Sequence, residues 1–183
     1  MGRTREPVVA SSAKTDAELT DREKKEWNHL ADMMERYHNH FKHNFHAIYQ
    51  NADKYPKGGP SLRRFLQESQ GLYRSLDMHH RIEEAYFFPL LAKRMPQFKA
   101  GARESGEHLK SHKAIHDGIE TYASLLLKYA SDPSTYSPEE LRGNMDSWRE
   151  VLFRHLDEEV EDLGWKRMRE AGFTLEEIRA FPE

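Results

Sequence analysis

Residues 79–89 read HHRIEEAYFFP, and this stretch decides how the rest of the chain is interpreted. Two histidines and two glutamates stand directly before an aromatic segment that ends at a proline. Burying a lone carboxylate is costly, so a chain that buries one must also supply a partner for it. The stretch therefore raises the question of whether these polar groups face the interior, and what holds them there.

The composition excludes several classes of site. The 183 residues include 28 Lys and Arg against 31 Asp and Glu, which gives no reason to expect nucleic acid or an anionic membrane as partner. The chain has no cysteine, so disulfides, thiolate metal sites, haem attachment through CxxCH and cysteine nucleophiles are excluded. No apolar run approaches the about 20 residues of a membrane span, and the N-terminus lacks the apolar region of a signal peptide. We expect a soluble, cytoplasmic protein.

Helix start and stop signals divide the chain into four long segments and one short one. Thr20 and Glu23 form a capping-box pattern, and Ser137 followed by Pro138 is a second strong helix start. The expected helices run from Thr20 to about Ala52, from Ser61 to about Met95 with a kink or early end at Pro89, over roughly 107–130, from Ser137 to about Leu163, and from the TLEE stretch at 174–177 to just before Pro182.

These segments predict an all-α fold, an up-down-up-down four-helix bundle with a disordered N-terminal tail and a short C-terminal helix. In this division residues 1–18 are the tail, residues 19–165 the bundle and residues 166–183 the helical extension. No alternation of apolar and polar residues typical of β-strands stands out.

The 11 histidines are the unusual feature of the composition, and several lie on the stripes that a bundle helix buries. Residues of one stripe recur three or four positions apart along the helix, and in the third helix His112 and His116 share a face with the apolar residues. The stripes are Trp27, Ala31, Met34, His38, Phe41, Phe45 and Ile48; Phe65, Ser69, Leu72, Leu76, His79, Glu83, Tyr86 and Leu90; His112, Ile115, His116, Ile119, Ala123 and Leu126; and Leu141, Met145, Trp148, Leu152, His155, Glu159 and Asp162.

Every long helix therefore carries at least one inward histidine, and two helices add a glutamate one turn later. The expected metal ligands are His38, His79, Glu83, His112, His116, His155 and Glu159. Imidazole and carboxylate donors suit iron, manganese or zinc. Two six-coordinate metals would be filled by these donors and a bridging oxygen except for one position, and a redox metal pair with one open position can bind a small oxidant such as O₂.

The histidines outside the stripes have weaker patterns. His29, His40, His43 and His46 are expected on a solvated face, and His80, Glu84 and His108 are expected next to the ligands rather than among them. The pair His80/Glu84 is the rival of His79/Glu83, but Asp77 interrupts its stripe one turn earlier.

The ordered set of motifs resembles the hemerythrin-like (HHE cation-binding) domain family. The motifs are YHNHF (37–41), HHRIEEAYFFP, HKAIHDG (112–118) and HLDEE (155–159), and the resemblance covers roughly residues 20–165. It implies a four-helix bundle around two non-haem iron ions with a bridging oxo or hydroxo group, held by the same seven residues. The C-terminal TLEEIRAFP is similar to the tail of stand-alone cytoplasmic members.

The resemblance leaves the physiological task open. The family's oxygen carriers end in HxxxxD, whereas here His155 and Glu159 are four residues apart. The first interpretation is a di-iron protein that binds O₂ or a peroxide-type ligand for oxygen or redox sensing or iron handling. The alternatives are a di-iron oxidase or peroxidase, and a structural zinc bundle. The expected partners are the small ligand and an unidentified redox partner, with no nucleic acid and no membrane, in a monomer or homodimer.

Overall fold

The computed structural model describes residue 15, residues 19–101 and residues 105–182, and over these residues the regular structure is entirely helical. This confirms the all-α class. Most of the expected disordered tail, and residues 102–104 of the expected connection, lie outside the described residues. Among the described helices, none has the length and apolar character needed to cross a membrane.

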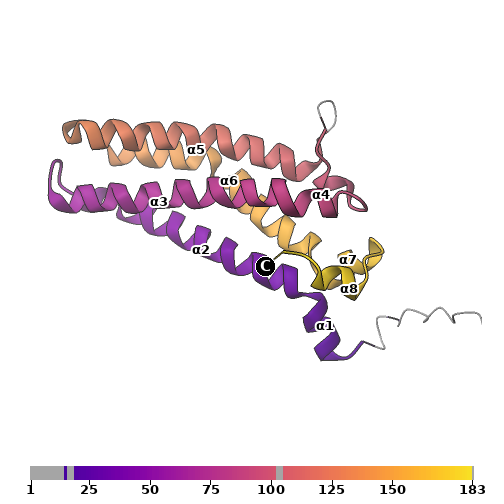
Figure 1. Ribbon diagram of the computed structural model, residues 1–183. Coiled ribbons are helices and arrows are strands. Elements are labelled where there is room, and N and C mark those ends of the chain that lie inside the picture. Colours follow the sequence, from indigo (N-terminus) through magenta and orange to yellow (C-terminus); the bar gives the residue numbers. More distant parts are fainter. Residues whose placement is uncertain (1–14, 16–18, 102–104, 183) are drawn as a thin grey trace, which may run out of the picture.

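Four long helices and several short ones follow one another along the chain (Figure 1). They are α1 Asp21–Trp27, α2 His29–Asn51, a 3₁₀ turn Ala52–Lys54, α3 Pro60–Ile82, a π-helical turn Glu83–Phe87, α4 Phe88–Leu91, a 3₁₀ turn Pro96–Phe98, α5 Glu107–Ser131, a 3₁₀ turn Pro133–Thr135, α6 Pro138–Asp162, α7 Trp165–Glu170 and α8 Leu175–Arg179.

The long helices pack in a closed set of neighbours. Helix α2 contacts α3 and α6, and α5 contacts the same two helices. The short helix α1 contacts both α7 and α8 at one end of the long helices (Figure 1). Each long helix therefore has two long neighbours, and the stripes that face them enclose a common interior.

The helix boundaries follow the capping signals closely. The Thr20 capping box with Glu23 is present, and Thr174 forms a second one with Glu177. The Ser137 hydroxyl accepts a hydrogen bond from the Glu140 N–H at 3.1 Å, with Pro138 at the first helical position. The expected third, fourth and last helices are confirmed, whereas α7 was not predicted.

The expected first helix is wrong in one respect, because it is two helices that meet at Asn28. The Asn28 side-chain carbonyl accepts a hydrogen bond from the Trp165 N–H at 2.9 Å. The bond ties the junction of α1 and α2 to the first residue of α7, whose N–H has no partner within its own helix. The break lets Trp27 pack, 7 % exposed, into an apolar cluster with the C-terminal helices.

The expected second helix also differs, because a π-helical turn precedes Pro89. The Phe88 N–H donates to the Glu83 carbonyl five residues earlier. Proline lacks an N–H and its ring clashes with the carbonyl four residues before it, so a wider turn relieves the conflict. The turn shifts the buried stripe by one residue: Phe87, Phe88 and Leu91 are buried, while the expected Tyr86 is 62 % exposed.

Two apolar cores lie along the long axis of the helices. The larger one contains Phe45, Tyr122 and Trp148, and the other joins α1, α4, α7 and α8 to the start of α2. On α2 the residue His38 lies between Met34 of the second core and Phe41 of the first. The buried polar residues therefore occupy the level where the two cores meet.

Candidate metal centre

Two groups of side chains that can bind metal lie in the interior between the long helices, and they share one residue. The first group consists of His38, His79, Glu83 and Glu159, and the second of His80, Glu83, His112 and His155. In each group the candidate ligand atoms lie within 4.8 Å of one another. Glu83 belongs to both groups: its Oε1 lies near His79 of the first group, and its Oε2 lies near His112 of the second.

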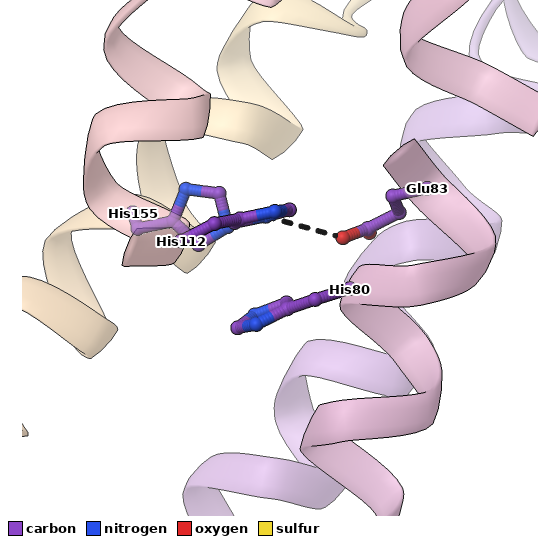
Figure 2. Close-up of side chains that lie close together, drawn as sticks. All are labelled: His80, Glu83, His112 and His155. Atoms are coloured by element: carbon purple, nitrogen blue, oxygen red, sulfur yellow. Dashed lines mark hydrogen bonds and ion pairs between the residues drawn. The ribbon is translucent and has the colours of Figure 1, made fainter. Parts of the chain in front are cut away.

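The side chains of the second group converge from three helices (Figure 2). His80 comes from α3 and Glu83 from the first position of the π-helical turn, while His112 comes from α5 and His155 from α6. The His112 Nε2 atom lies 3.4 Å from Glu83 Oε2 and 3.0 Å from His155 Nε2. These atoms point at a common volume rather than at separate partners.

The first group is equally compact. His79 Nε2 lies 2.8 Å from Glu83 Oε1 and 3.1 Å from His38 Nε2. Glu159 Oε2 lies 3.6 Å from His38 Nε2 and 3.7 Å from His155 Nε2. The Glu159 carboxylate therefore lies between a histidine of the first group and a histidine of the second, and it links the groups as Glu83 does.

The buried carboxylates lack hydrogen-bond partners. Both oxygens of Glu83 and of Glu159, and both ring nitrogens of His80, are buried without a hydrogen bond among the described residues. Imidazole nitrogens lie close to the oxygens but not in hydrogen-bond geometry. Two uncompensated carboxylates in an apolar interior are strongly destabilising, and cations held between the nitrogens and oxygens would satisfy all of these atoms. The donor set fits metal ions.

A second layer of contacts fixes the orientation of the histidines. His38 Nδ1 lies 2.8 Å from the Leu156 carbonyl, and His112 Nδ1 lies 2.8 Å from Glu84 Oε1. Each of these acceptors requires the Nδ1 atom to carry the proton, which leaves the Nε2 lone pair facing the centre. This is the tautomer that metal ligation through Nε2 requires.

A longer chain of contacts supports His155. His108 Nε2 donates to Asp162 Oδ2 at 3.0 Å, so its Nδ1 accepts from His155 Nδ1 at 3.4 Å. Partial burial would raise the Asp162 pKa, but the hydrogen bonds from His108 and Gln97, together with the charges of His108 and Arg167, lower it on balance. The acid therefore remains ionised and keeps the His155 Nε2 lone pair available to the centre.

The pKa shifts of three buried histidines suit metal binding, whereas for His112 the lowering effect of burial is outweighed by Glu83 and Glu84, which raise its pKa. Burial lowers the pKa of His38 to about 4, and burial together with the neighbouring His112 lowers the pKa of His80 and of His155 well below the usual range. These three rings are neutral at pH 7. Neutral imidazole is the form that binds metal.

The pKa values of the two buried glutamates are shifted in opposite directions. Burial alone would raise the pKa of Glu83, but His79 and His112 outweigh it and hold that pKa well below its usual range. Burial and the charge of Glu83 raise the pKa of Glu159 well above its usual range. Two carboxylates that share one buried, apolar site cannot both stay ionised without added positive charge.

The structure brings together six of the seven expected ligands. His116 is the exception: its side chain is 27 % exposed, and its Nδ1 lies 3.9 Å from Asp77 Oδ1. The buried stripe of α5 is His108, His112, Ile115, Ile119, Tyr122, Leu126 and Tyr129. Its spacing alternates strictly between four and three, which leaves His116 beside the stripe. Its role as a ligand stays a prediction.

The second group contains His80 instead of the expected His116. It was expected beside the ligands, but it is fully buried within the second group. His79 and His80 are three and four residues after the buried Leu76, so the seam of α3 passes between them and both rings face inward. The sequence contains a sign that both histidines face inward, because His79 and His80 precede Glu83 by four and three residues, and both spacings place side chains on one face of a helix.

Most of the remaining polar expectations agree with the structure, but Asp162, expected on the inward stripe, keeps 22 % of its side chain exposed. Glu84 and His108 contact His112 and His155, and Glu158 is exposed beside Glu159. The four histidines expected on a solvated face are exposed: His29, His40, His43 and His46.

Comparison with known families agrees with this geometry. Residues 29–164 match the model of the hemerythrin HHE cation binding domain. The chain belongs to this family. It is also 29% identical over 131 residues to the dimeric xanthone biosynthesis cluster protein R11 of Cryptosporiopsis sp. (strain 8999), an alignment that covers 72% of this chain and 47% of that protein. The chain thus spans about half the length of that relative. No solved structure matches the chain.

Proposed function

We propose that this hemerythrin-family chain is a non-haem di-iron protein that binds O₂ or a related small oxidant. The observation that carries the proposal is the position of Glu83, whose carboxylate belongs to both groups of donors. A carboxylate shared between two nearby donor sets suits a pair of metal ions better than one ion. The seven converging groups, five imidazoles and two carboxylates without thiolate, are donors that suit iron.

The finer architecture belongs to the same proposal. We infer an up-down-up-down four-helix bundle of α2, α3, α5 and α6, supported by the closed set of contacts among these helices. By resemblance to stand-alone members of the family, the protein would work in the cytoplasm, as a monomer or homodimer. Its ligand would be O₂ or a peroxide-type molecule, and its redox partner is not specified by the site.

The residues of the chain have distinct tasks in this function. The iron pair, with a bridging oxo or hydroxo group, would supply reversible electron exchange with the oxidant. Six of the expected ligands and His80 hold the metals, while Leu156, Glu84 and His108 orient the histidine rings. The apolar side chains of the two cores exclude bulk water from the centre. The roles that fit such a centre are oxygen or redox sensing and iron handling.

A di-iron oxidase or peroxidase is the second candidate, and a specific observation favours it. A cavity of about 470 Å³ is lined by His79 and Glu83, so a molecule larger than O₂ has access to the centre. The name of the R11 relative places that protein in a biosynthesis cluster. For this chain, a biosynthetic oxidation is one form that the proposed oxidase activity would take.

Metal analysis combined with an optical spectrum tests the proposal. The chain purified from iron-supplemented cells should hold about two iron atoms and absorb in the near-ultraviolet, with a change on adding azide or peroxide. Zinc alone from iron-rich cells would support the structural zinc bundle instead, and about one metal per chain would contradict a metal pair. Turnover with a reductant and peroxide would separate the enzyme from the binding protein.

A further inference from the structure

The cavity beside the metal centre has features of a binding site for an organic molecule. It lies between α2 and α3 and has a volume of about 470 Å³, within the about 300–1,000 Å³ typical of small-molecule sites. Its buried lining includes Met33, Met34, Phe41 and Phe87. A diatomic molecule does not need a space of this size.

The cavity is also where the metal centre approaches the solvent. His79 is 10 % exposed, whereas the side chains of His38, Glu83 and Glu159 are at most 1 % exposed. His79 and Glu83 both line the cavity. A molecule that fills the cavity therefore contacts the centre from its accessible side.

The lining selects an aromatic body. Methionine sulfur makes favourable contacts with aromatic rings, and phenylalanine and tyrosine pack against rings face to edge or offset. Met78 and Tyr37 also line the cavity, and they are 58 % and 55 % exposed. Large apolar side chains exposed together around one cavity are a feature of ligand-binding grooves.

One cation lines the cavity as well. Arg74 donates a hydrogen bond to Gln70 Oε1 at 3.0 Å, and no carboxylate in the described part of the chain forms an ion pair with it. A guanidinium group with spare donors recognises a carboxylate in a fork geometry. It lies on the same helix as His79, five residues earlier.

We propose that this cavity binds a small aromatic acid, with its carboxylate on Arg74 and its ring system extending toward His79 and Glu83. The inference goes beyond the binding of a small oxidant, and it does not require a metal in the centre. The ligand class follows from the apolar and aromatic lining, the volume and the unpaired arginine.

Calorimetric titration with 2-naphthoate, and with the neutral 2-naphthol, tests the proposal on the full chain. Both probes should bind saturably. Ser75→Trp places a large side chain in the cavity lining and should weaken both probes about tenfold. Ser124→Trp, at an exposed serine of α5, is the matched control and should leave binding unchanged.

Substitution of the arginine tests the acid. Arg74→Gln should weaken 2-naphthoate about fivefold and leave 2-naphthol unchanged, because only the carboxylate loses a charged partner. Arg63→Gln, an exposed arginine of the same helix outside this cavity, is its control. Equal loss of both probes in Arg74→Gln would refute the assignment of an acid.

The placement beside His79 has its own readout. In metal-free protein, saturating 2-naphthoate should shift the imidazole NMR signals of His79 and leave those of the exposed His46 in place. The proposal is wrong if neither probe binds saturably, if Ser75→Trp binds like the wild type, or if light scattering shows a dimer that Ser75→Trp dissociates, since a second copy would then cover this face. Because these titrations need no iron, their failure is separable from a failure of the di-iron proposal, which metal content decides.

Discussion

The ring of His80 stacks on the ring of His112, with centroids 3.9 Å apart and planes inclined by 18°. Phe88 stacks on His112 as well, with centroids 5.0 Å apart and planes inclined by 28°. The three rings link the helix that carries HHRIEE to α5, and they hold His80 inside the metal centre.

The choice between His80 and His116 as ligand can be decided by substitution. We expect His80→Ala to lose about one of two metals per chain, because its buried nitrogens have no other partner. His116→Ala should keep both, because its ring is part-exposed beside Asp77. Iron per chain by elemental analysis measures both. Retained iron in His80→Ala with loss in His116→Ala would restore the ligand set expected from the sequence.

The register of α6 is tested by two neighbouring glutamates. Glu159→Gln keeps the shape of a buried donor but removes its charge, so metal affinity should fall by at least about 10–100-fold, the loss that changes to outer contacts cause. Glu158 is exposed beside Arg154, and Glu158→Gln should change stability by less than about 0.5 kcal/mol. Competition with a chelator measures the affinities. The reverse ranking would mean that α6 is rotated relative to the structure.

Metal removal should destabilise the chain. Without cations, Glu83 and Glu159 remain buried without hydrogen bonds. A ligand present at 100 times its dissociation constant adds about 2.7 kcal/mol, which corresponds to about 5–10 °C in melting temperature for a chain of this length. Calorimetry of the loaded and chelated protein measures the difference. Equal melting temperatures would contradict metal binding at these residues.

Two glycines give opposite expectations for the helix packing. A Cβ atom on Gly118 of α5 would lie 2.6 Å from the Cβ of Trp148 on α6, so Gly118→Ala should cost about 1–3 kcal/mol. Gly143 has open space around it inside α6, and Gly143→Ala should stabilise by about 0.5–1 kcal/mol. Urea unfolding separates them. A neutral Gly118→Ala would show that α5 and α6 are further apart than described.

The pH dependence of the C-terminal helix follows from Glu177. The hydrogen bond from Arg94 at 2.8 Å lowers the pKa of Glu177 to about 2, against an ordinary value near 4.5. This contribution is complete above the unfolded value and disappears as the pH falls toward the folded one. Glu177→Gln should therefore be less stable than the wild type at pH 7, and the gap should narrow toward pH 3. Urea midpoints measure it, with the exposed Glu176→Gln as a control that shows no such gap.

Much of the fold was predictable because its signals are local. The Thr20 and Thr174 capping boxes and the Ser137 hydroxyl satisfy helix-end N–H groups within one turn, and Pro138 lacks an N–H that would need a partner. These signals therefore mark helix starts whatever surrounds them. The inward stripe of α2, and that of α6 from Leu141 to Glu159, were also confirmed, since they follow from the helical period alone.

The break at Asn28 coincides with a distant contact, whereas the π-helical turn at Glu83–Phe87 relieves a local conflict at Pro89. At the junction of α1 and α2 the Asn28 side chain meets Trp165, which lies 137 residues further along the chain. The wide turn before Pro89 moves Phe87 and Phe88 into the core and turns Tyr86 outward. The spacing of apolar residues gives neither effect, because the first involves a distant segment and the second depends on how the backbone relieves the conflict at Pro89.

The sequence by itself determined the class of the chain, most of its helix starts and six of the inward metal-ligating residues, namely His38, His79, Glu83, His112, His155 and Glu159. Only the tertiary structure decided that His80 rather than His116 completes the second group, that Glu83 is shared by both, and that a cavity reaches the centre beside His79. The physical reason is that helical spacing fixes a direction within about one residue on the surface of a helix. Which of two adjacent side chains reaches a common point depends on how the helices are rotated and how far apart they pack, and those are properties of the assembled interior.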